Sequence, residues 1–235
     1  MINMIFGNLS PQLLIMRLIA VTLALTVHEF CHGYAAYKLG DRTAHGMGRL
    51  SLNPAHHIDP IGMILIILFG FGWAKPVMVN PFNLLNPKRD MAIISIAGPL
   101  SNFIMAFVTM MIAYPMITLV GGGGIAQMHN MMHFLGRAPT GLWGNIFGFM
   151  GVFVIINIVL GVFNLIPIPP LDGSKILALF LPNHLYFRFT NFRYGMHIMM
   201  VLIIFGGTSF VIMPALNGIF DVFFRIASAL YGLIL

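Results

Sequence analysis

The sequence predicts an all-α, polytopic membrane protein, and two observations indicate this class. Of the 235 residues, 59% are hydrophobic and only 8% are charged, whereas soluble domains carry about 25% charged residues. Apolar runs also recur along the whole length of the chain, and about 20 apolar residues suffice for one membrane-crossing helix. We therefore expect a helical bundle in the lipid bilayer that forms one domain over residues 1–235, without a separate soluble module.

Six apolar segments define the expected bundle: 11–37, 61–73, 91–120, 142–166, 194–212 and 215–235. The second has about 13 residues, or ~20 Å of helix, which is too short for a hydrocarbon core of ~30 Å. It is expected to be a re-entrant or half-depth segment, and a small membrane-associated β element is a further expectation for this region and the following stretch, 70–81. The last two segments are expected to form a hairpin around Pro214, although the number of crossings after residue 182 stays open.

Basic residues in the loops predict the orientation of the segments. Three loops carry several of them, and the loop at 121–141 carries only Arg137. By the positive-inside rule, the three loops rich in basic residues are cytoplasmic and the loop at 121–141 is external. This assignment is consistent only if segment 61–73 does not cross the membrane. The residues concerned are Lys38, Arg42, Arg49, Lys75, Lys88, Arg89, Lys175, Arg188 and Arg193. We expect a multi-pass protein of the cell membrane.

Charge and cysteine content exclude other classes. The net charge of +6 arises from scattered basic residues, which indicates topology signals and contacts with anionic lipids, not a nucleic-acid partner. Cys31 is the sole cysteine, so no internal disulfide forms. No basic region precedes the first apolar segment, and a cleaved signal peptide is not expected. The sequence does not specify an oligomeric state.

The stretch TVHEFCHGY, residues 26–34, places the only glutamate of the chain inside an apolar segment. His28, Glu29 and His32 form an H-E-x-x-H pattern, in which both imidazoles share one helix face and can bind one ion. Neutral imidazole suits Zn²⁺, and the neighbouring carboxylate can take a proton from a metal-activated water. Random placement would produce this pattern in about one such chain per thousand. The alternative is a pair of structural histidines beside a buried structural acid, but ionisable groups in membrane segments are usually functional.

The third metal ligand can be narrowed by exclusion. A downstream glutamate is impossible, and the extended motif that ends in a third histidine fails because Lys38 stands at its last position. A distant histidine or an aspartate remains, and the aspartates are 41, 59, 90, 172 and 221. Asp172 stands out in NLIPIPPLDG, residues 164–173, at the predicted cytoplasmic end of a segment, the same membrane face as His32. The alternative is that Asp172 caps a short helix over 173–181.

These motifs resemble the site-2 protease family of intramembrane zinc metalloproteases. The resemblance rests on HEFCH at 28–32 and NLIPIPPLDG at 164–173, with SLNPAHHIDPIG at 51–62, GFGWAKPVMVNP at 70–81 and AGPLSNF at 97–103. It implies a compact bacterial-type member with zinc held by His28, His32 and Asp172, and with Glu29 as the catalytic acid and base. The segment KPVMVNP departs slightly from the family pattern KPVPVNP.

Other polar residues are assigned with alternatives. Asn164 is a candidate for orienting the substrate carbonyl or stabilising an oxyanion, or else for tying two helices together. Asn102 is expected to serve packing and a helix end, with Pro99 in a first helical turn. His56 and His57 are expected on the surface, His129 and His133 in an external loop without a metal, and Cys31 in packing.

The predicted function is hydrolysis of peptide bonds in transmembrane-segment substrates, in or beside the bilayer. The short segment and stretch 70–81 are expected to offer a backbone edge to an extended substrate. The alternative is a metal transporter or a catalytically inactive metal-binding membrane protein. A transporter should line a path through the membrane with several polar ligands, whereas the candidate ligands here lie at one depth, and an inactive relative would usually lack the base.

Overall fold

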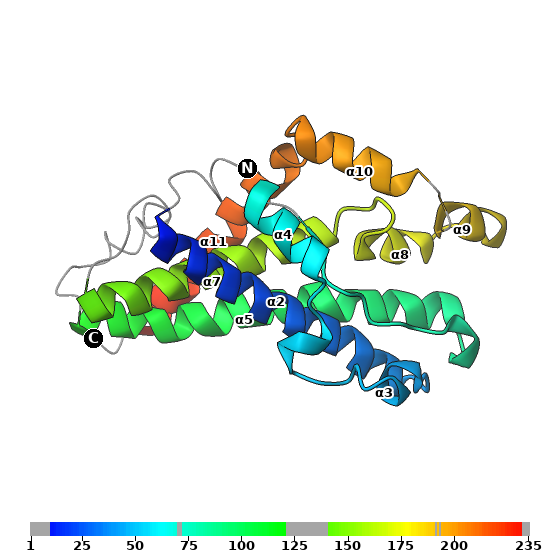
Figure 1. Cartoon of the computed structure of the whole chain (residues 1–235), viewed down its shortest axis with the longest axis horizontal. Coiled ribbons are helices and arrows are strands. Elements are labelled where there is room, and N and C mark those ends of the chain that lie inside the picture. Colours follow the sequence, from blue (N-terminus) through cyan, green and yellow to red (C-terminus); the bar gives the residue numbers. More distant parts are fainter. Residues whose placement is uncertain (1–9, 70–71, 121–140, 191, 193, 232–235) are drawn as a thin grey trace.

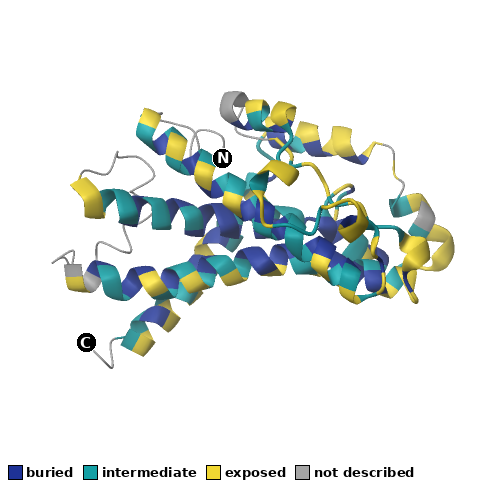
Figure 2. Cartoon of the chain, turned by 60° about the horizontal axis from the view of Figure 1, so that its bottom comes forward, coloured by how far each residue is buried: buried dark blue, intermediate teal, exposed yellow. Residues whose placement is uncertain are grey.

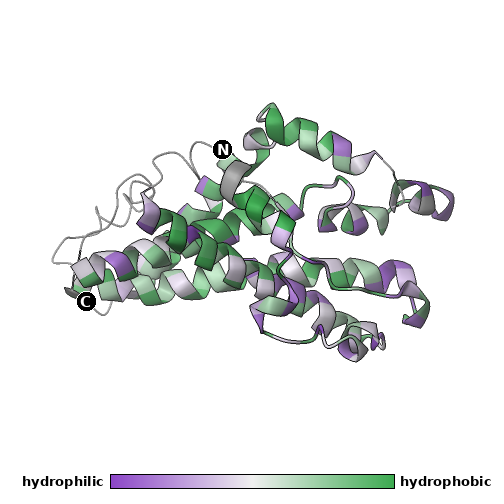
Figure 3. Cartoon of the chain, viewed as in Figure 1, coloured by the Kyte–Doolittle hydropathy of each residue, from purple (hydrophilic) through white to green (hydrophobic). Residues whose placement is uncertain are grey.

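The computed structural model describes residues 10–69, 72–120, 141–190, 192 and 194–231, and within these ranges the secondary structure is helical, with no strand. Four long helices run side by side: α2 (Pro11–Lys38), α5 (Pro87–Val120), α7 (Gly141–Asn164) and α11 (Ser209–Tyr231) (Figure 1). Each is long and apolar enough to cross a membrane, and hydrophobic residues dominate them in Figure 3. The prediction of an all-α, multi-pass membrane protein is confirmed.

The four long helices bury their facing sides in one core (Figure 2). Small residues allow close approach, as expected between membrane helices: Ala20 and Ala24 of α2 and Ala106 of α5 are fully buried. On α7, a Cβ at Gly161 would lie 2.8 Å from the ring of Phe103 on α5. On the outer face of α2, Ile15 is 57% exposed, which suits contact with lipid.

Seven shorter elements complete the described chain: α3 (Thr43–Gly46), η1 (Pro54–His56), α4 (Pro60–Phe69), η2 (Pro81–Asn83), α8 (Asp172–Ala178), α9 (Asn183–Thr190) and α10 (Gly195–Ile204). The ten residues of α4 span about 15 Å, so the prediction that this segment is too short to cross is confirmed. Asp59 precedes the helix and accepts hydrogen bonds from the amides of Ile61 and Gly62.

The expected β element is not found among the described residues, and residues 72–80 form neither a helix nor a strand. The reason lies in the partners of the backbone amides. The amide of Lys75 donates to the carbonyl of His57, that of Val77 to the carboxylate of Glu29, and that of Asn80 to the carboxylate of Asp41. Side chains and a loop carbonyl thus satisfy donors that a neighbouring strand would otherwise bind.

Two predictions about prolines are wrong. The helical structure is interrupted between α10 and α11, at residues 205–208. Pro214, where the interruption was expected, lies inside α11. Gly206 explains the break, because its φ of +73° is a left-handed conformation that favours glycine and ends a helix. Pro99 lies inside α5 and not in a first turn. Helix α5 begins earlier than expected, at Pro87, because Asp90 accepts a hydrogen bond from the amide of Asn86 just before it.

Asp41 holds together the loops at the end of α2. Its buried carboxylate accepts hydrogen bonds from the amide of Thr43 at 3.0 Å, the amide of Asn80 at 2.7 Å and the side-chain amide of Asn83 at 2.7 Å. Burial alone would raise the pKa of Asp41, but the hydrogen bonds outweigh it and the pKa lies below its ordinary value. The ionised carboxylate therefore fixes segment 72–80 to α2.

We predict that Asp41→Asn loosens segment 72–80 at neutral pH. The variant should lose about 1–3 kcal/mol of local stability, since one carboxylate oxygen is replaced by an amide group that cannot accept. The lowered pKa means that the wild-type contribution is complete above about pH 4 and is lost as pH falls through the folded-state value. Hydrogen exchange at the Asn80 amide measures it, with Asp59→Asn as the control. Unchanged protection of that amide in Asp41→Asn would contradict the prediction.

Candidate metal centre

The candidate site begins with one turn of α2. His28 and His32 are four residues apart on the same face, and their Nε2 atoms lie 3.0 Å from each other. Both side chains are buried, at 3% and 9% exposure. The sequence pattern predicts this arrangement directly, because helical residues i and i+4 lie one above the other.

Asp172 joins the two histidines from the start of α8. Its Oδ2 lies 3.3 Å from Nε2 of His28 and 3.1 Å from Nε2 of His32. Gly173 permits this position, because a Cβ there would lie 2.1 Å from the carbonyl oxygen of Leu165. The alternative that Asp172 caps α8 is wrong. The N-cap residue is Leu171, without a side-chain capping bond, and Asp172 points to the histidines instead.

The three ligand atoms fit a zinc ion. In a tetrahedral site with bonds of about 2.0–2.1 Å, neighbouring ligand atoms lie about 3.3 Å apart, and the observed separations are 3.0, 3.1 and 3.3 Å. The other nitrogen of His32, Nδ1, donates to the carbonyl of Ile94 at 2.7 Å, so Nε2 of the neutral ring carries a lone pair. Lone pairs and a carboxylate that converge in a buried site repel one another unless a cation lies between them.

Asp172 is anionic in this site. Burial raises the pKa of its carboxyl group, and the nearby charge of Lys175 acts in the opposite direction and favours the ionised form. The ammonium of Lys175 lies 3.6 Å from Oδ1, the oxygen that faces away from the histidines. The other oxygen, Oδ2, therefore faces the two histidines and the candidate metal position.

Sequence reasoning missed the role of Asn102. Its Oδ1 lies 2.6 Å from Nδ1 of His28, and its side chain is fully buried. The expectation of a helix end is wrong, because Asn102 lies inside α5. Asn102 is buried between helices, as expected for packing, and it also contacts a candidate ligand. Its position in the GPLSN motif was the only available signal, and a motif does not show which helix face meets α2.

Gly98 was also missed, and it forms the floor of the site. A Cβ at this position of α5 would lie 2.4 Å from Nε2 of His32 and 2.6 Å from Nε2 of His28. Both distances are shorter than any ordinary contact. The absence of a side chain at Gly98 therefore leaves the space in which an ion would sit.

Glu29 lies next to the ligands but is not one of them. It is half-buried, and the three residues whose ligand atoms lie within 4.8 Å of one another are His28, His32 and Asp172. Its Oε2 accepts a hydrogen bond of 2.9 Å from the amide of Val77. The carboxylate is thus held between α2 and segment 72–80, where a general base is expected.

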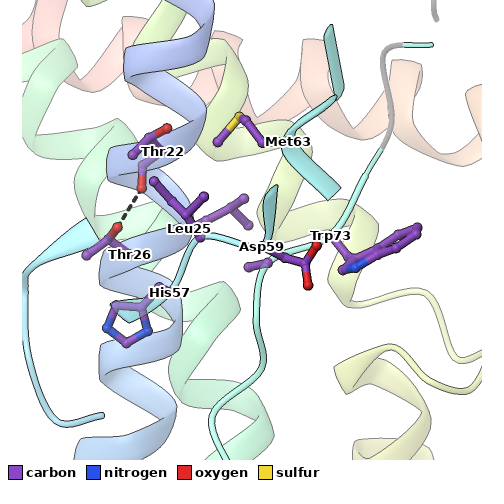
Figure 4. A pocket seen from close by; sticks show the side chains of 9 residues that line it. Thr22, Leu25, Thr26, His57, Asp59, Met63 and Trp73 are labelled. Carbon is purple, nitrogen blue, oxygen red and sulfur yellow. Dashed lines mark hydrogen bonds between the residues drawn. The ribbon is translucent and has the colours of Figure 1, made fainter. Parts of the chain in front are cut away.

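A small pocket lies along α2, on the N-terminal side of the two histidines, and is bounded by α4 and by Trp73 (Figure 4). Thr22, Leu25 and Thr26 line it from α2, and His57 closes one end. The prediction of a surface position is wrong for His57, which is 1% exposed and donates from Nε2 to the carbonyl of Ser51 at 2.7 Å. Its neighbour His56 is exposed, as predicted.

The remaining candidates are placed as follows. Asn164 ends α7, and its side-chain amide donates to the carbonyl of Leu160 in the same helix at 3.0 Å. This bond is within one helix and does not support a tie between two helices. His129 and His133 lie outside the described residues.

Comparison with known proteins identifies the family. The sequence pattern of peptidase family M50 matches residues 16–206, most of the chain and all of the site described above. The chain belongs to peptidase family M50. The predicted resemblance to site-2 proteases is confirmed, and with it the metallopeptidase class.

Individual relatives of this M50 peptidase carry zinc metalloprotease names. The chain is 38% identical to YwhC of Bacillus subtilis over 95% of its own length and 94% of the relative. It is 30% identical to a protein of Methanocaldococcus jannaschii over 73% of its length and 74% of the relative. It is 28% identical to Rip2 of Mycolicibacterium smegmatis, of which it spans 51%. No solved structure matches the chain. The names and the geometry of the site support the predicted zinc cofactor.

We predict that Gly98→Ala abolishes metal binding without unfolding the protein. The added Cβ would occupy the space between the two Nε2 atoms, whereas alanine is favoured over glycine in helices by about 1 kcal/mol. Zinc content and thermal unfolding of the zinc-free protein measure the two effects separately. The matched control is Gly218→Ala in α11, where a Cβ meets nothing within 4 Å. A Gly98→Ala protein that retains zinc would contradict this prediction.

Proposed function

We propose that this M50 peptidase is a zinc endopeptidase that hydrolyses peptide bonds of transmembrane-segment proteins in or near the bilayer, as in regulated intramembrane proteolysis. One observation carries the proposal: three buried ligand atoms converge, and two of them come from the turn of α2 that also carries Glu29, in a helix long enough to cross a membrane. A peptide embedded in the bilayer can approach a site that is buried among such helices from within the membrane.

His28, His32 and Asp172 are the proposed zinc ligands, which leaves one coordination position for water or substrate. When bound, zinc would supply a Lewis acid that polarises the scissile carbonyl and lowers the pKa of water. The chain itself holds the histidine rings through Ile94 and Asn102 and excludes bulk solvent by burial.

Glu29 is the proposed acid and base. Its carboxylate takes a proton from the attacking water, whose oxygen forms a bond to the carbonyl carbon. It then donates the proton to the amide nitrogen as the carbon–nitrogen bond breaks, so that the products are a carboxylic acid and an amine. The amide of Val77 orients the carboxylate through Oε2.

Segment 72–80 is the proposed binding edge for substrate. A helical substrate must unwind before its peptide bond can react, and an extended backbone can pair with it. The contact between Val77 and Glu29 supports this assignment, because it brings the segment next to the reacting groups. Asn164 remains a candidate for the oxyanion, and its amide has a second N–H besides the one bonded to Leu160.

The alternatives lack comparable support. An inactive relative would be expected to have lost the base, but Glu29 is present and oriented. A transporter needs ligands along a path, and within the described part of the chain only one group of three potential ligands is found. We therefore favour an active peptidase over an inactive relative or a metal transporter.

The proposed location is the cell membrane, with residues 1–235 as one domain and the site toward the cytoplasm. His32 is six residues before the end of α2 at Lys38, which is about 9 Å along the helix axis. The loops that follow are rich in lysine and arginine, which favours the cytoplasmic side.

Glu29→Gln should retain zinc but lose cleavage by about 10²–10⁴-fold, because glutamine cannot accept the proton. The assay uses proteoliposomes with single-span substrates, and zinc content is measured on the same samples. Undiminished cleavage by this variant would refute the peptidase mechanism.

Asp172→Asn tests the proposed metal ligand independently of the proposed base, Glu29. It should lower zinc affinity by at least 10-fold, since the anionic ligand is replaced by a neutral amide. Lys175→Gln is the control, because it changes a charge beside Asp172 without removing a proposed ligand. Zinc affinity that is unchanged in Asp172→Asn would remove this residue from the ligand set.

Orientation is testable with single cysteines in a Cys31→Ala background. Met47 directly follows α3 and Leu119 lies in the last turn of α5, and both are exposed, at 56% and 70%. Figure 1 shows α3 and the C-terminal end of α5 at opposite ends of the bundle. In intact cells, a membrane-impermeant thiol reagent should label Leu119→Cys and spare Met47→Cys. The reverse pattern would place the site on the outer side.

A further inference from the structure

A histidine binds a metal through Nε2 only if that nitrogen is unprotonated, so a neutral ring must carry its proton on Nδ1. For His32, a backbone carbonyl enforces this tautomer, because the carbonyl of Ile94 can only accept a hydrogen bond. For His28, the partner of Nδ1 is the side chain of Asn102. A carboxamide can present either its oxygen or its NH₂ group, so Asn102 by itself leaves the tautomer of His28 undecided.

A second asparagine lies behind the first. The Nδ2 of Asn102 is 2.9 Å from the Oδ1 of Asn157 on α7, and the Nδ2 of Asn157 is 2.8 Å from the carbonyl oxygen of Phe153. Both asparagines are fully buried, at 0% exposure. A line of hydrogen bonds thus runs from α7 through α5 to the metal-binding turn of α2.

The last member of this line determines the direction of every bond in it. The carbonyl of Phe153 only accepts, so Asn157 must present its NH₂ group there and its oxygen to Asn102. Asn102 must then donate through its NH₂ group, and its oxygen faces His28. His28 can only donate to that oxygen, so its proton lies on Nδ1 and Nε2 is free for a metal.

We propose that Asn157 is a positioning residue that sets the tautomer of His28 through Asn102. It acts through another residue and contacts neither substrate nor metal. The inference rests on the proposed ligand set and adds to it a reason why α7, which supplies none of the three ligands, is needed for metal binding. Residues that fix a metal-bound histidine typically change affinity about 10–100-fold when removed.

The first test compares Asn157→Leu with Asn145→Leu. Asn145 is a matched control, because it lies on the same helix and forms a side-chain hydrogen bond to Gln12 of α2, away from the ligands. Asn157→Leu should weaken zinc binding about 10–100-fold in a chelator competition, and Asn145→Leu should not. In the zinc-free protein at pH 8, ¹⁵N NMR should show His28 as a mixture of tautomers only in Asn157→Leu.

The second test restores the direction of the bonds without Asn157. Aspartate at position 157 keeps an oxygen toward Asn102, so Asn157→Asp should bind zinc within about threefold of wild type even if it is less stable. Asn102→Asp presents an oxygen to His28 whichever way it is turned. In the Asn102→Asp background, adding Asn157→Leu should change the zinc affinity little. The effects of the two substitutions on zinc affinity should therefore be strongly non-additive in a double-mutant cycle.

The outcomes separate this inference from the proposed function, because zinc affinity and the tautomer are measured without cleavage. Wild-type affinity and a single His28 tautomer in Asn157→Leu would overturn it. An equal loss from Asn157→Leu in the wild-type and Asn102→Asp backgrounds would overturn it too, since the effect would then not pass through the orientation of Asn102. If Asn157→Leu does not fold, Asn157→Asp decides: weak zinc binding by a folded protein would refute the proposal.

Discussion

The structure depends on one electrostatic constraint: two imidazole nitrogens and a carboxylate oxygen converge within about 3 Å of one another in the interior of an apolar bundle. Such a cluster is unfavourable without a cation, because a low-dielectric interior strengthens repulsion and leaves polar groups unsolvated. Each neighbouring feature follows from this requirement. Gly98 leaves room for the ion, and Ile94 and Asn102 turn the lone pairs inward.

The polar groups around the metal centre are satisfied by contacts between segments far apart in the chain. The carboxylates of Glu29 and Asp41 accept the backbone amides of residues 77 and 80, which have no neighbouring strand to bind among the described residues. Glu29 is therefore both the candidate base and a contact that orders the segment above it. A substrate that displaced or extended this segment would change the surroundings of the carboxylate that we propose as the base.

Local sequence signals were sufficient where the structure depends on residues close in the chain. The short length of α4, the four long apolar helices and the i, i+4 pair of His28 and His32 all follow from helix geometry. The errors fell where local signals conflict. Pro214 and Pro99 are helix breakers by local preference, yet both lie inside membrane helices, where packing against neighbouring helices outweighs the loss of one hydrogen bond. The interruption between α10 and α11 lies instead at the two glycines, residues 206 and 207.

The sequence by itself determined the class of the protein and the H-E-x-x-H pair, because residue type and spacing are enough for these. The lack of a second glutamate narrowed the third ligand to an aspartate or a distant histidine, and Asp172 stood out among these through its motif and the family resemblance. Only the tertiary structure decided which faces of α5 and α7 meet α2, and therefore which residues surround the ion. Gly98, Asn102 and Asn157 act across helices separated by tens of residues, and no periodicity in the sequence specifies the rotation of one buried helix against another. That rotation is set by the packing of small residues and buried amides over the whole bundle.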